Sequence, residues 1–170
     1  RIHALENLAT TDELTSLLNR RGFYDVFLRE LDRTTRGQSR GGLLVLIDMD
    51  NFKMINDRHG HQAGDAALRL VAKTLRKETR VMDAAGRLGG DEFVLLMVDA
   101  KPEDVLERAQ TLIRKLNALT LNWHGTAIPV RASLGLKRYN AGDTPEAVFS
   151  VADSRLYDEK KKQKWPRKRF

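Results

Sequence analysis

Apolar residues recur at helical spacing near the start of the chain and then run together. Phe23, Phe27 and Leu31 lie four residues apart, which places them on one face of a helix. After a polar loop, residues 43–47 are all apolar. A short unbroken apolar run is typical of a central strand that is buried on both faces. We therefore predict a helix, a loop and a buried strand that ends at Asp48.

The middle of the chain repeats these two patterns. Residues 65–80 are predicted to form a second helix, and residues 93–98 are predicted to form another buried strand. Acidic residues follow Pro102, as is favourable in the first turn of a third helix. The stripe that this helix would turn inward consists of Leu106, Ala109, Ile113 and Leu116.

The last third of the chain mixes a hairpin with a helix. A hairpin loop is expected over residues 122–125, followed by a strand of roughly alternating character over residues 127–136. Thr144 and Pro145 match a helix N-cap and the first helical position. The pattern predicts helices that cover a sheet, and a length of 170 residues suits a single domain.

Charge is distributed unevenly along this chain. The net charge is +7, but seven of the 30 basic residues lie in the segment 160–170, which has no acid. The rest therefore carries 23 basic and 23 acidic residues, which is unlike the broad basic surface of a nucleic-acid-binding protein. The absence of cysteine excludes disulfides, thiolate zinc sites and a cysteine nucleophile.

The first residues are predicted to be the end of a stalk helix. Ile2, Leu5 and Leu8 recur at helical spacing, so residues 1–10 are interpreted as this stalk and residues 11–170 as the domain with its basic tail. A local amphipathic turn is the alternative. No apolar run is long enough to cross a bilayer, so we expect no direct membrane insertion.

The most informative segment is Gly89-Gly90-Asp91-Glu92-Phe93, which joins a glycine turn to two carboxylates. Together with Asp48 at the end of the first buried strand, it could bring oxygen ligands to Mg²⁺, which prefers hard oxygens and shares its shell with substrate phosphates. The glycines would let backbone N–H groups approach a phosphate. From these residues alone, two surface carboxylates at loop ends are an equally good interpretation.

Further segments accompany these residues in a recognisable order, continuing to Ala152-Asp153 and Leu156-Tyr157 in the last helix. The three main ones are Asp12-Glu13-Leu14-Thr15-Ser16-Leu17-Leu18-Asn19-Arg20-Arg21, then Asp48-Met49-Asp50-Asn51-Phe52-Lys53-Met54-Ile55-Asn56-Asp57 with Gly60-His61-Gln62-Ala63-Gly64-Asp65, and Arg87-Leu88-Gly89-Gly90-Asp91-Glu92-Phe93. Over nearly its whole length the chain resembles the GGDEF family of diguanylate cyclases.

The resemblance implies an α+β fold with a central, mostly antiparallel five-stranded sheet flanked by helices, like nucleotide cyclases and the polymerase palm. It also implies that two copies of the domain, each with one GTP, condense two GTP into cyclic di-GMP and pyrophosphate. Asp48, Asp91 and the carbonyl of Met49 would hold two Mg²⁺ ions, for which Mn²⁺ is an alternative, and Asp91 and Glu92 would be the catalytic carboxylates.

The resemblance further implies a set of GTP-binding residues. Asn56 and Asp65 would read guanine, His61 would lie near the nucleotide, and Lys53 would meet the triphosphate. From the residues alone, an exposed lysine is the default interpretation of Lys53, and an ordinary loop histidine is an equally good interpretation of His61. Gln163, Lys164 and Trp165 replace the family's usual Gly-Arg-Asn. The full predicted set is Phe52, Lys53, Asn56, His61, Asp65, Gly89, Gly90, Lys160 and Lys164.

Arg80 and Asp83 have the spacing of the family's inhibitory RxxD motif, five residues before the glycine turn. The resemblance implies that they bind the product, cyclic di-GMP. From the sequence alone, an Arg and an Asp three residues apart usually form only a solvated pair.

Three functional hypotheses follow. The first is an active, homodimeric diguanylate cyclase in the cytoplasm, regulated by a domain that precedes this segment. The second is a catalytically silent module that binds GTP or cyclic di-GMP and signals through protein contacts. The third is a nucleic-acid-binding module led by the basic tail, which the neutral remainder of the chain disfavours, so no nucleic-acid partner is expected.

Overall fold

The computed structural model describes residues 9–167, and the side chains of residues 9–162. Its central sheet has the strand order β2-β3-β1-β6, and every neighbouring pair is antiparallel. A separate two-stranded hairpin is formed by β4 and β5. The strands are β1 (Gly42–Met49), β2 (Ala84–Gly89), β3 (Glu92–Met97), β4 (Thr120–Trp123), β5 (Thr126–Pro129) and β6 (Ala132–Tyr139).

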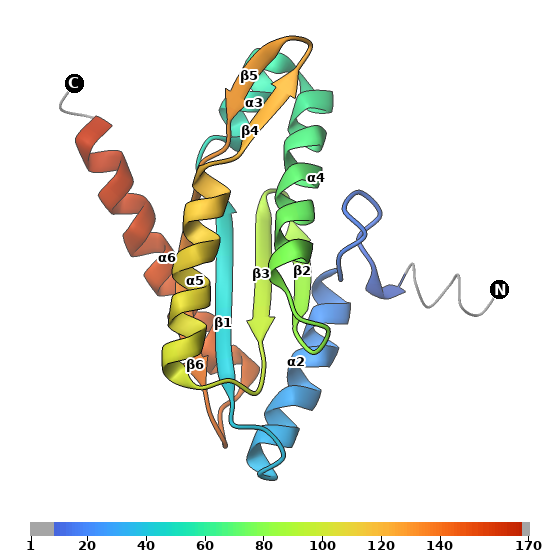
Figure 1. The fold of residues 1–170 in the computed structure, drawn as a ribbon, viewed down its shortest axis with the longest axis vertical. Helices are drawn as coiled ribbons and strands as arrows, with labels where there is room; N and C mark the ends of the chain where they lie inside the picture. The colour runs from blue at the N-terminus through green and yellow to red at the C-terminus, as the bar shows by residue number, and fades with distance from the viewer. Residues whose placement is uncertain (1–8, 168–170) are drawn as a thin grey trace.

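Helices cover both faces of this sheet. In Figure 1, α4 and α5 lie in front of the sheet, and side chains of α2 and α6 pack against the other face. The short α3 precedes α4 and contacts it. The helices are α2 (Arg20–Thr35), α3 (Phe52–His59), α4 (His61–Glu78), α5 (Pro102–Asn117) and α6 (Pro145–Arg167). The stalk predicted over residues 1–10 lies almost entirely outside the described residues.

The predicted α+β class with an antiparallel sheet flanked by helices is confirmed, but within residues 9–167 the central sheet has four strands where five were expected. Beyond β2, the place of a fifth strand is taken by Leu18, which forms a single parallel bridge. Its N–H donates to the carbonyl of Ala85 at 3.2 Å, and its carbonyl accepts from the N–H of Arg87 at 2.8 Å. This contact anchors the segment before α2 to the edge of the sheet.

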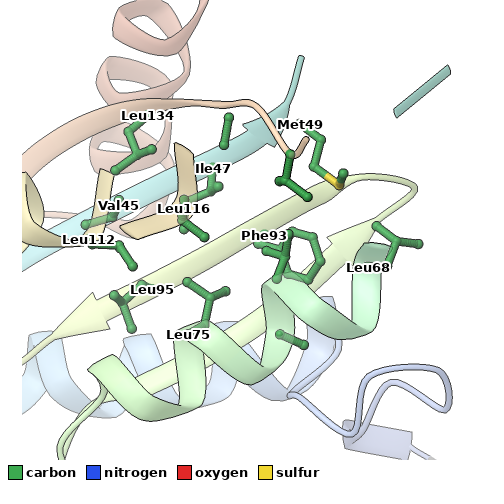
Figure 2. Close-up of a cluster of buried hydrophobic side chains, with 14 of the residues drawn as sticks. Val45, Ile47, Met49, Leu68, Leu75, Phe93, Leu95, Leu112, Leu116 and Leu134 are labelled. Atoms are coloured by element: carbon green, nitrogen blue, oxygen red, sulfur yellow. The ribbon is translucent and has the colours of Figure 1, made fainter. Parts of the chain in front are cut away.

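Strand β1 is buried on both faces, which explains its unbroken apolar sequence. Val45, Ile47 and Met49 belong to the cluster under α4 and α5, whereas Leu44 and Leu46 face the cluster under α2 and α6. The alternation follows from the two-residue repeat of a strand. Figure 2 shows the first cluster, in which the labelled residues are Val45, Ile47, Met49, Leu68, Leu75, Phe93, Leu95, Leu112, Leu116 and Leu134.

The second cluster is built on aromatic side chains and contains a buried acid. The ring of Phe27 packs edge-on against Tyr139 and Phe149, with centroids 5.6 and 5.8 Å apart. The carboxylate of Glu30 accepts hydrogen bonds from the hydroxyls of Tyr139 and Ser39, both at 2.7 Å. Burial, together with the hydrogen bond and charge of Glu30, raises the pKa of Tyr139 above its usual range.

Two helix predictions need correction. The helix predicted over residues 65–80 begins earlier, at His61, and the preceding helix α3 was not predicted. Gly60 separates the two helices with φ +91, which is a conformation that favours glycine. In α5, the predicted stripe is rotated: Leu106 is 44% exposed, and Val105, Ala109, Leu112 and Leu116 are the buried residues.

Two strand predictions also need correction. The strand predicted over residues 127–136 is divided into β5 and β6. The side chain of Asn51 donates to the carbonyl of Pro129 at 2.7 Å and accepts from the N–H of Arg131 at 3.2 Å. These bonds fix the chain where it passes from the hairpin to the central sheet. Strand β2 was not predicted at all, because its small residues have weak β-propensity and only pairing with β3 makes it a strand.

We predict that Tyr139→Phe destabilises the fold. The substitution keeps the aromatic ring but removes a hydroxyl that donates to Glu30. Losing a partner of a buried carboxylate should lower the free energy of unfolding by about 1–3 kcal/mol, as measured by urea unfolding. Tyr157→Phe is the matched control, because Tyr157 is 59% exposed. Equal stability of the two variants would contradict a structural role for the Glu30 network.

Candidate active site

The Gly-Gly turn joins β2 to β3, and Gly89 is paired with Glu92 at the end of the two strands. Gly89 has φ +146 and Gly90 has φ +49, so both lie where side chains are disfavoured. A Cβ atom at either position would meet nothing within 4 Å, which means that backbone conformation rather than crowding requires glycine. Both residues are exposed. Their backbone is therefore open to a ligand, as the sequence predicts for a phosphate-binding turn.

Arg87 holds this hairpin in place. Its Nε donates to the carbonyl of Gly90 at 2.9 Å, and its Nη1 lies 3.1 Å from Oδ1 of Asp12. Both partners of the ion pair are largely buried. Burial by itself would raise the pKa of Asp12. Hydrogen bonds from Thr15 and the charge of Arg87 outweigh this effect and lower the pKa below its usual value. This role of Arg87 could not be predicted from local pattern, because 75 residues separate Arg87 from Asp12.

The structure brings Asp48 and Asp91 together. The N–H of Met49 donates to the carbonyl of Asp91 at 3.4 Å, and Asp48 is the register partner of Glu92 across the β1–β3 pair. Burial raises the pKa of Asp91 to about 6, and the hydrogen bond and charge of Asp48 raise it as well. The two carboxyls share a hydrogen bond only when one is protonated. When both are ionised, Oδ1 of Asp48 is buried with no hydrogen-bond partner among the described residues.

A lysine from α6 faces this carboxylate pair. Nζ of Lys160 lies 2.6 Å from Oδ2 of Asp48, and its charge lowers the pKa of Asp91 against the stronger effects of burial and Asp48. Lys160 therefore lies beside the Asp48–Asp91 pair, and its contact with GTP phosphates stays a prediction. The side chain of Lys164 lies outside the described side chains.

The donor set fits a hard divalent cation. Two carboxylates with one unpaired buried oxygen favour a positive charge between them, and Mg²⁺ prefers oxygen ligands. The side chain of Met49 is buried in the core, so only its backbone carbonyl could contribute. Among residues whose placement is described, no three His, Asp or Glu side chains are grouped tightly enough to hold a metal by themselves. Substrate phosphates would therefore have to complete the coordination shell.

The residues predicted to read guanine lie on α3 and α4. Oδ1 of Asn56 is buried and has no hydrogen-bond partner in the described structure. Gly64 packs directly against it, since a Cβ at Gly64 would be 1.8 Å from that oxygen, and the ring of Phe52 is the next neighbour. Asp65 follows Gly64 and is half-buried, whereas Lys53 and His61 are exposed. Phe52, Asn56 and the start of α4 are thus brought together, with Lys53 and His61 outside the buried part.

Arg80 and Asp83 lie on one turn, but their environments differ. The carboxylate of Asp83 is fully buried and accepts from the N–H groups of Arg80 at 2.9 Å and Val98 at 3.1 Å. It also pairs with Nη2 of Arg108, at 2.5 Å. Arg80 itself is exposed and lines a hollow of about 240 Å³ together with Arg108. Arg108 was missed by sequence reasoning, since it belongs to no motif and reaches Asp83 only through the fold.

The structure combines an antiparallel sheet covered by helices with a carboxylate pair and a Gly-Gly hairpin at one end of the sheet. This combination is that of an α+β domain built around a GGDEF hairpin. The family model described as "Diguanylate cyclase, GGDEF domain" matches residues 9–165. The chain therefore belongs to the GGDEF domain family.

Three comparisons illustrate this membership. The chain is 37% identical over 159 residues to the diguanylate cyclase DgcP of Pseudomonas aeruginosa, covering 90% of this chain and 23% of that protein. It superposes on the diguanylate cyclase SiaD of Pseudomonas aeruginosa, solved with its activator SiaC, with TM-score 0.86 and 31% identity over 95% of this chain and 62% of that chain. The coiled coil and GGDEF domain of DgcB from Caulobacter crescentus, solved with c-di-GMP, gives TM-score 0.86 and 28% identity over 94% of this chain and 85% of that chain.

These comparisons cover a part of larger proteins. The chain spans about a quarter of DgcP and about a third of DosC and PleD, which are other curated relatives that it matches. Within the part of the chain that the structure describes, every helix is too short or too polar to cross a bilayer.

We predict that Asp91→Asn stabilises the fold in the absence of divalent cations. The pKa of Asp91 lies above its ordinary 3.8, at about 6, so the folded state loses stability as pH rises from about 4 to about 6. A shift of this size corresponds to roughly 3 kcal/mol for a buried group, and solvent screening should reduce it to about 1 kcal/mol. At pH 7.5 the variant should melt about 3 °C higher, and below pH 4 the difference should vanish.

The same melting experiment tests the cation. Adding Mg²⁺ at pH 7.5 should raise the melting temperature of the unsubstituted protein more than that of Asp91→Asn, since the variant has lost one carboxylate. Asp158→Asn, at an exposed position of α6, should behave like the unsubstituted protein. An equal response to Mg²⁺ in all three proteins would contradict a metal site at Asp91.

Proposed function

We propose that this domain is an active diguanylate cyclase, which condenses two GTP into cyclic di-GMP and two pyrophosphates across a homodimer. The observation that carries the proposal is the Asp48–Asp91 pair beside the exposed Gly89-Gly90 turn. Related proteins of this family, such as DgcP, are named diguanylate cyclases. Because the chain spans a minor part of these relatives, the activity of the whole protein belongs to the proposal.

Different residues of the site would bind the guanine base and the phosphates of GTP. Asn56 and Asp65 would bind the guanine base, because a carboxylate accepts from its N–H groups and an amide both donates and accepts. Phe52, Lys53 and His61 border this position. The N–H groups of Gly89 and Gly90 would meet the phosphates, and Lys160 would neutralise their charge. In each transfer the 3′-oxygen of one GTP bonds to the α-phosphorus of the other, and pyrophosphate leaves.

Asp48, Asp91 and the Met49 carbonyl would hold two Mg²⁺ ions, with Mn²⁺ as an alternative. When bound, these ions would acidify the 3′-hydroxyl and stabilise charge at the α-phosphate. Glu92, which is exposed and lies opposite Asp48, would complete the site and accept the hydroxyl proton. Lys160 would exchange its contact with Asp48 for one with the substrate phosphates.

A second copy of the chain would be needed because the transfer joins two nucleotides, and Asn56 and Asp65 would bind the guanine of one. Bringing two bound GTP molecules together would supply the reaction geometry. A regulatory domain elsewhere in the full-length protein would control this pairing, and GTP as substrate places the reaction in the cytoplasm. A silent module that binds GTP or cyclic di-GMP is the alternative, which intact Asp48, Asp91 and Glu92 disfavour.

We also propose feedback inhibition at the turn that carries Arg80. Two guanidinium groups, from Arg80 and Arg108, line the hollow next to it, and guanidinium pairs well with phosphate and with a guanine edge. The relative DgcB was solved with c-di-GMP. In this structure Asp83 holds the turn and Arg108 in place, so it would support the site by positioning Arg108. Direct contact of Asp83 with guanine, as the motif predicts, would require it to release these partners.

The activity is tested by incubating the protein with GTP and Mg²⁺ and detecting cyclic di-GMP by chromatography. We expect product from the unsubstituted dimer and at least a hundredfold less from Asp91→Ala, because the carboxylate pair is lost. Asp158→Asn should retain activity. Product that persists with Asp91→Ala would contradict the metal assignment, and GTP binding without any product would favour the silent module.

Product inhibition is tested with Arg80→Ala. The concentration of cyclic di-GMP that halves the rate should rise about tenfold or more, since one of the two guanidinium groups is lost. Arg69→Ala removes an exposed arginine from α4 and should leave inhibition unchanged. If inhibition of Arg80→Ala equals that of the unsubstituted protein, the turn is not the inhibitory site.

A further inference from the structure

The side of α6 that faces the sheet changes from apolar to basic at Lys160. Val148, Ala152 and Leu156 recur every four residues and are buried in the cluster under α2 and α6. Lys160 is the next residue of this series, and its side chain is 28% exposed. Residues four apart lie on one face of a helix, so the packing of α6 determines that Lys160 faces the sheet.

Strand β1 changes from apolar to acidic at the same level. Leu46 belongs to the cluster under α2 and α6, and Asp48 has the same orientation two residues later. Gly135 of β6 is the register partner of Leu46 and fixes the height of α6 along the strand. A Cβ at Gly135 would lie 2.6 Å from the backbone nitrogen of Leu156, so helix and sheet touch one turn before Lys160.

The two charged residues form an ion pair at this point. Nζ of Lys160 lies 2.6 Å from Oδ2 of Asp48, and the side chain of Asp48 is largely buried. The other carboxylate oxygen, Oδ1, is buried and has no hydrogen-bond partner among the described residues. Lys160 thus compensates the charge of a proposed metal ligand. Because two cations at one carboxylate repel each other, Mg²⁺ could bind Asp48 only after the ammonium group had moved away.

Lys160 can move without a change in the fold, because its charge stands at the end of a flexible four-carbon stem while apolar contacts hold α6. Leaving Asp48 is nevertheless unfavourable if the ammonium group gains no other anion. The phosphates of a nucleotide at the Gly89-Gly90 turn would provide that anion. Nucleotide binding would therefore remove the lysine from the carboxylate at which Mg²⁺ is to bind.

We propose that Lys160 couples Mg²⁺ binding to GTP binding, because it competes with Mg²⁺ for Asp48 in the nucleotide-free protein and turns to the phosphates when both are bound. This inference rests on the proposed cyclase function and adds a regulation of its metal site. The coupling is reciprocal, so Mg²⁺ strengthens GTP binding by the same factor by which GTP strengthens Mg²⁺ binding. The carboxylates would then hold the metal mainly in a subunit that already carries its substrate.

Two simpler roles of Lys160 lead to different results. If Lys160 were a phosphate ligand alone, its removal would weaken nucleotide binding and leave the affinity for the metal by itself unchanged. If it merely fixed α6 to β1, its removal would weaken both. The proposed competition predicts changes of opposite sign: tighter binding of the metal by itself and weaker binding of the nucleotide in the presence of the metal.

Lys160→Gln tests the first of these changes. Mn²⁺ is titrated into nucleotide-free protein, and the free ion is followed by electron paramagnetic resonance. The dissociation constant of Mn²⁺ should fall about tenfold, because the competing cation is lost. Lys162→Gln is the matched control, since it makes the same charge change on α6 at a side chain that is 74% exposed. Lys160→Arg, which keeps the charge, should bind Mn²⁺ as weakly as the unsubstituted protein.

The second change is measured with 3′-deoxy-GTP, which lacks the attacking hydroxyl and cannot be condensed. In the presence of Mn²⁺ its dissociation constant should rise about tenfold in Lys160→Gln, because a charge partner of the phosphates is lost. Adding Asp48→Asn to Lys160→Gln should abolish the gain in Mn²⁺ affinity, which assigns the gain to Asp48. Thermal melting verifies that each variant is folded.

An Mn²⁺ affinity of nucleotide-free Lys160→Gln that is equal to or lower than that of the unsubstituted protein would overturn the coupling. A gain that persists with Asp48→Asn, a gain matched by Lys162→Gln, or an unchanged affinity for 3′-deoxy-GTP would do the same. These results leave the cyclase function intact if the unsubstituted protein makes cyclic di-GMP. A protein that makes none would overturn the proposed function, whereas the Mn²⁺ titrations would still decide whether Lys160 competes for Asp48.

Discussion

The structure depends on β1, which is hydrogen-bonded on both edges and buried on both faces. It pairs with β3 and β6, and its side chains alternate between the two apolar clusters. A strand confined in this way cannot slip by one residue without turning its apolar side chains to the wrong face. The position of Asp48 at its end is therefore fixed by the core, and the hairpin that follows β2 is brought to it by pairing with β3.

Glu30 and the Asp48–Asp91 pair differ in how the fold compensates their negative charge. Glu30 accepts from the hydroxyls of Tyr139 and Ser39, so its burial is compensated by partners within the fold. Asp48 and Asp91 lie close enough to repel each other, and one oxygen of Asp48 lacks a partner among the described residues. Folding alone does not favour such a pair. Its relief requires a cation, which Lys160 supplies in this structure and Mg²⁺ would supply in the proposed reaction.

Asn56, on α3, also has a buried polar atom that the described part of the fold leaves without a hydrogen-bond partner. Its buried carbonyl oxygen has no partner in the described structure, although Gly64 leaves it room. Buried polar atoms are normally hydrogen-bonded, so this oxygen is free to accept from a water molecule or a ligand. The carboxylate pair at the hairpin and the amide on α3 thus each leave a buried oxygen without a hydrogen-bond partner among the described residues.

The sequence by itself determined the parts that depend on local pattern. The apolar run of β1, the spacing of Phe23 and Phe27, the cap at Thr144 and the GGDEF motif all follow from neighbouring residues, and they sufficed for the fold class and the family. Tertiary structure decided what depends on distant partners. It divided one expected strand between Pro129 and Ala132, where the side chain of Asn51 binds the chain. It also made a strand of β2 through pairing with β3 and turned Val105 inward in place of Leu106. It also joined Arg87 to Asp12 and Arg108 to Asp83, because an ion pair between distant segments leaves no local periodicity to read.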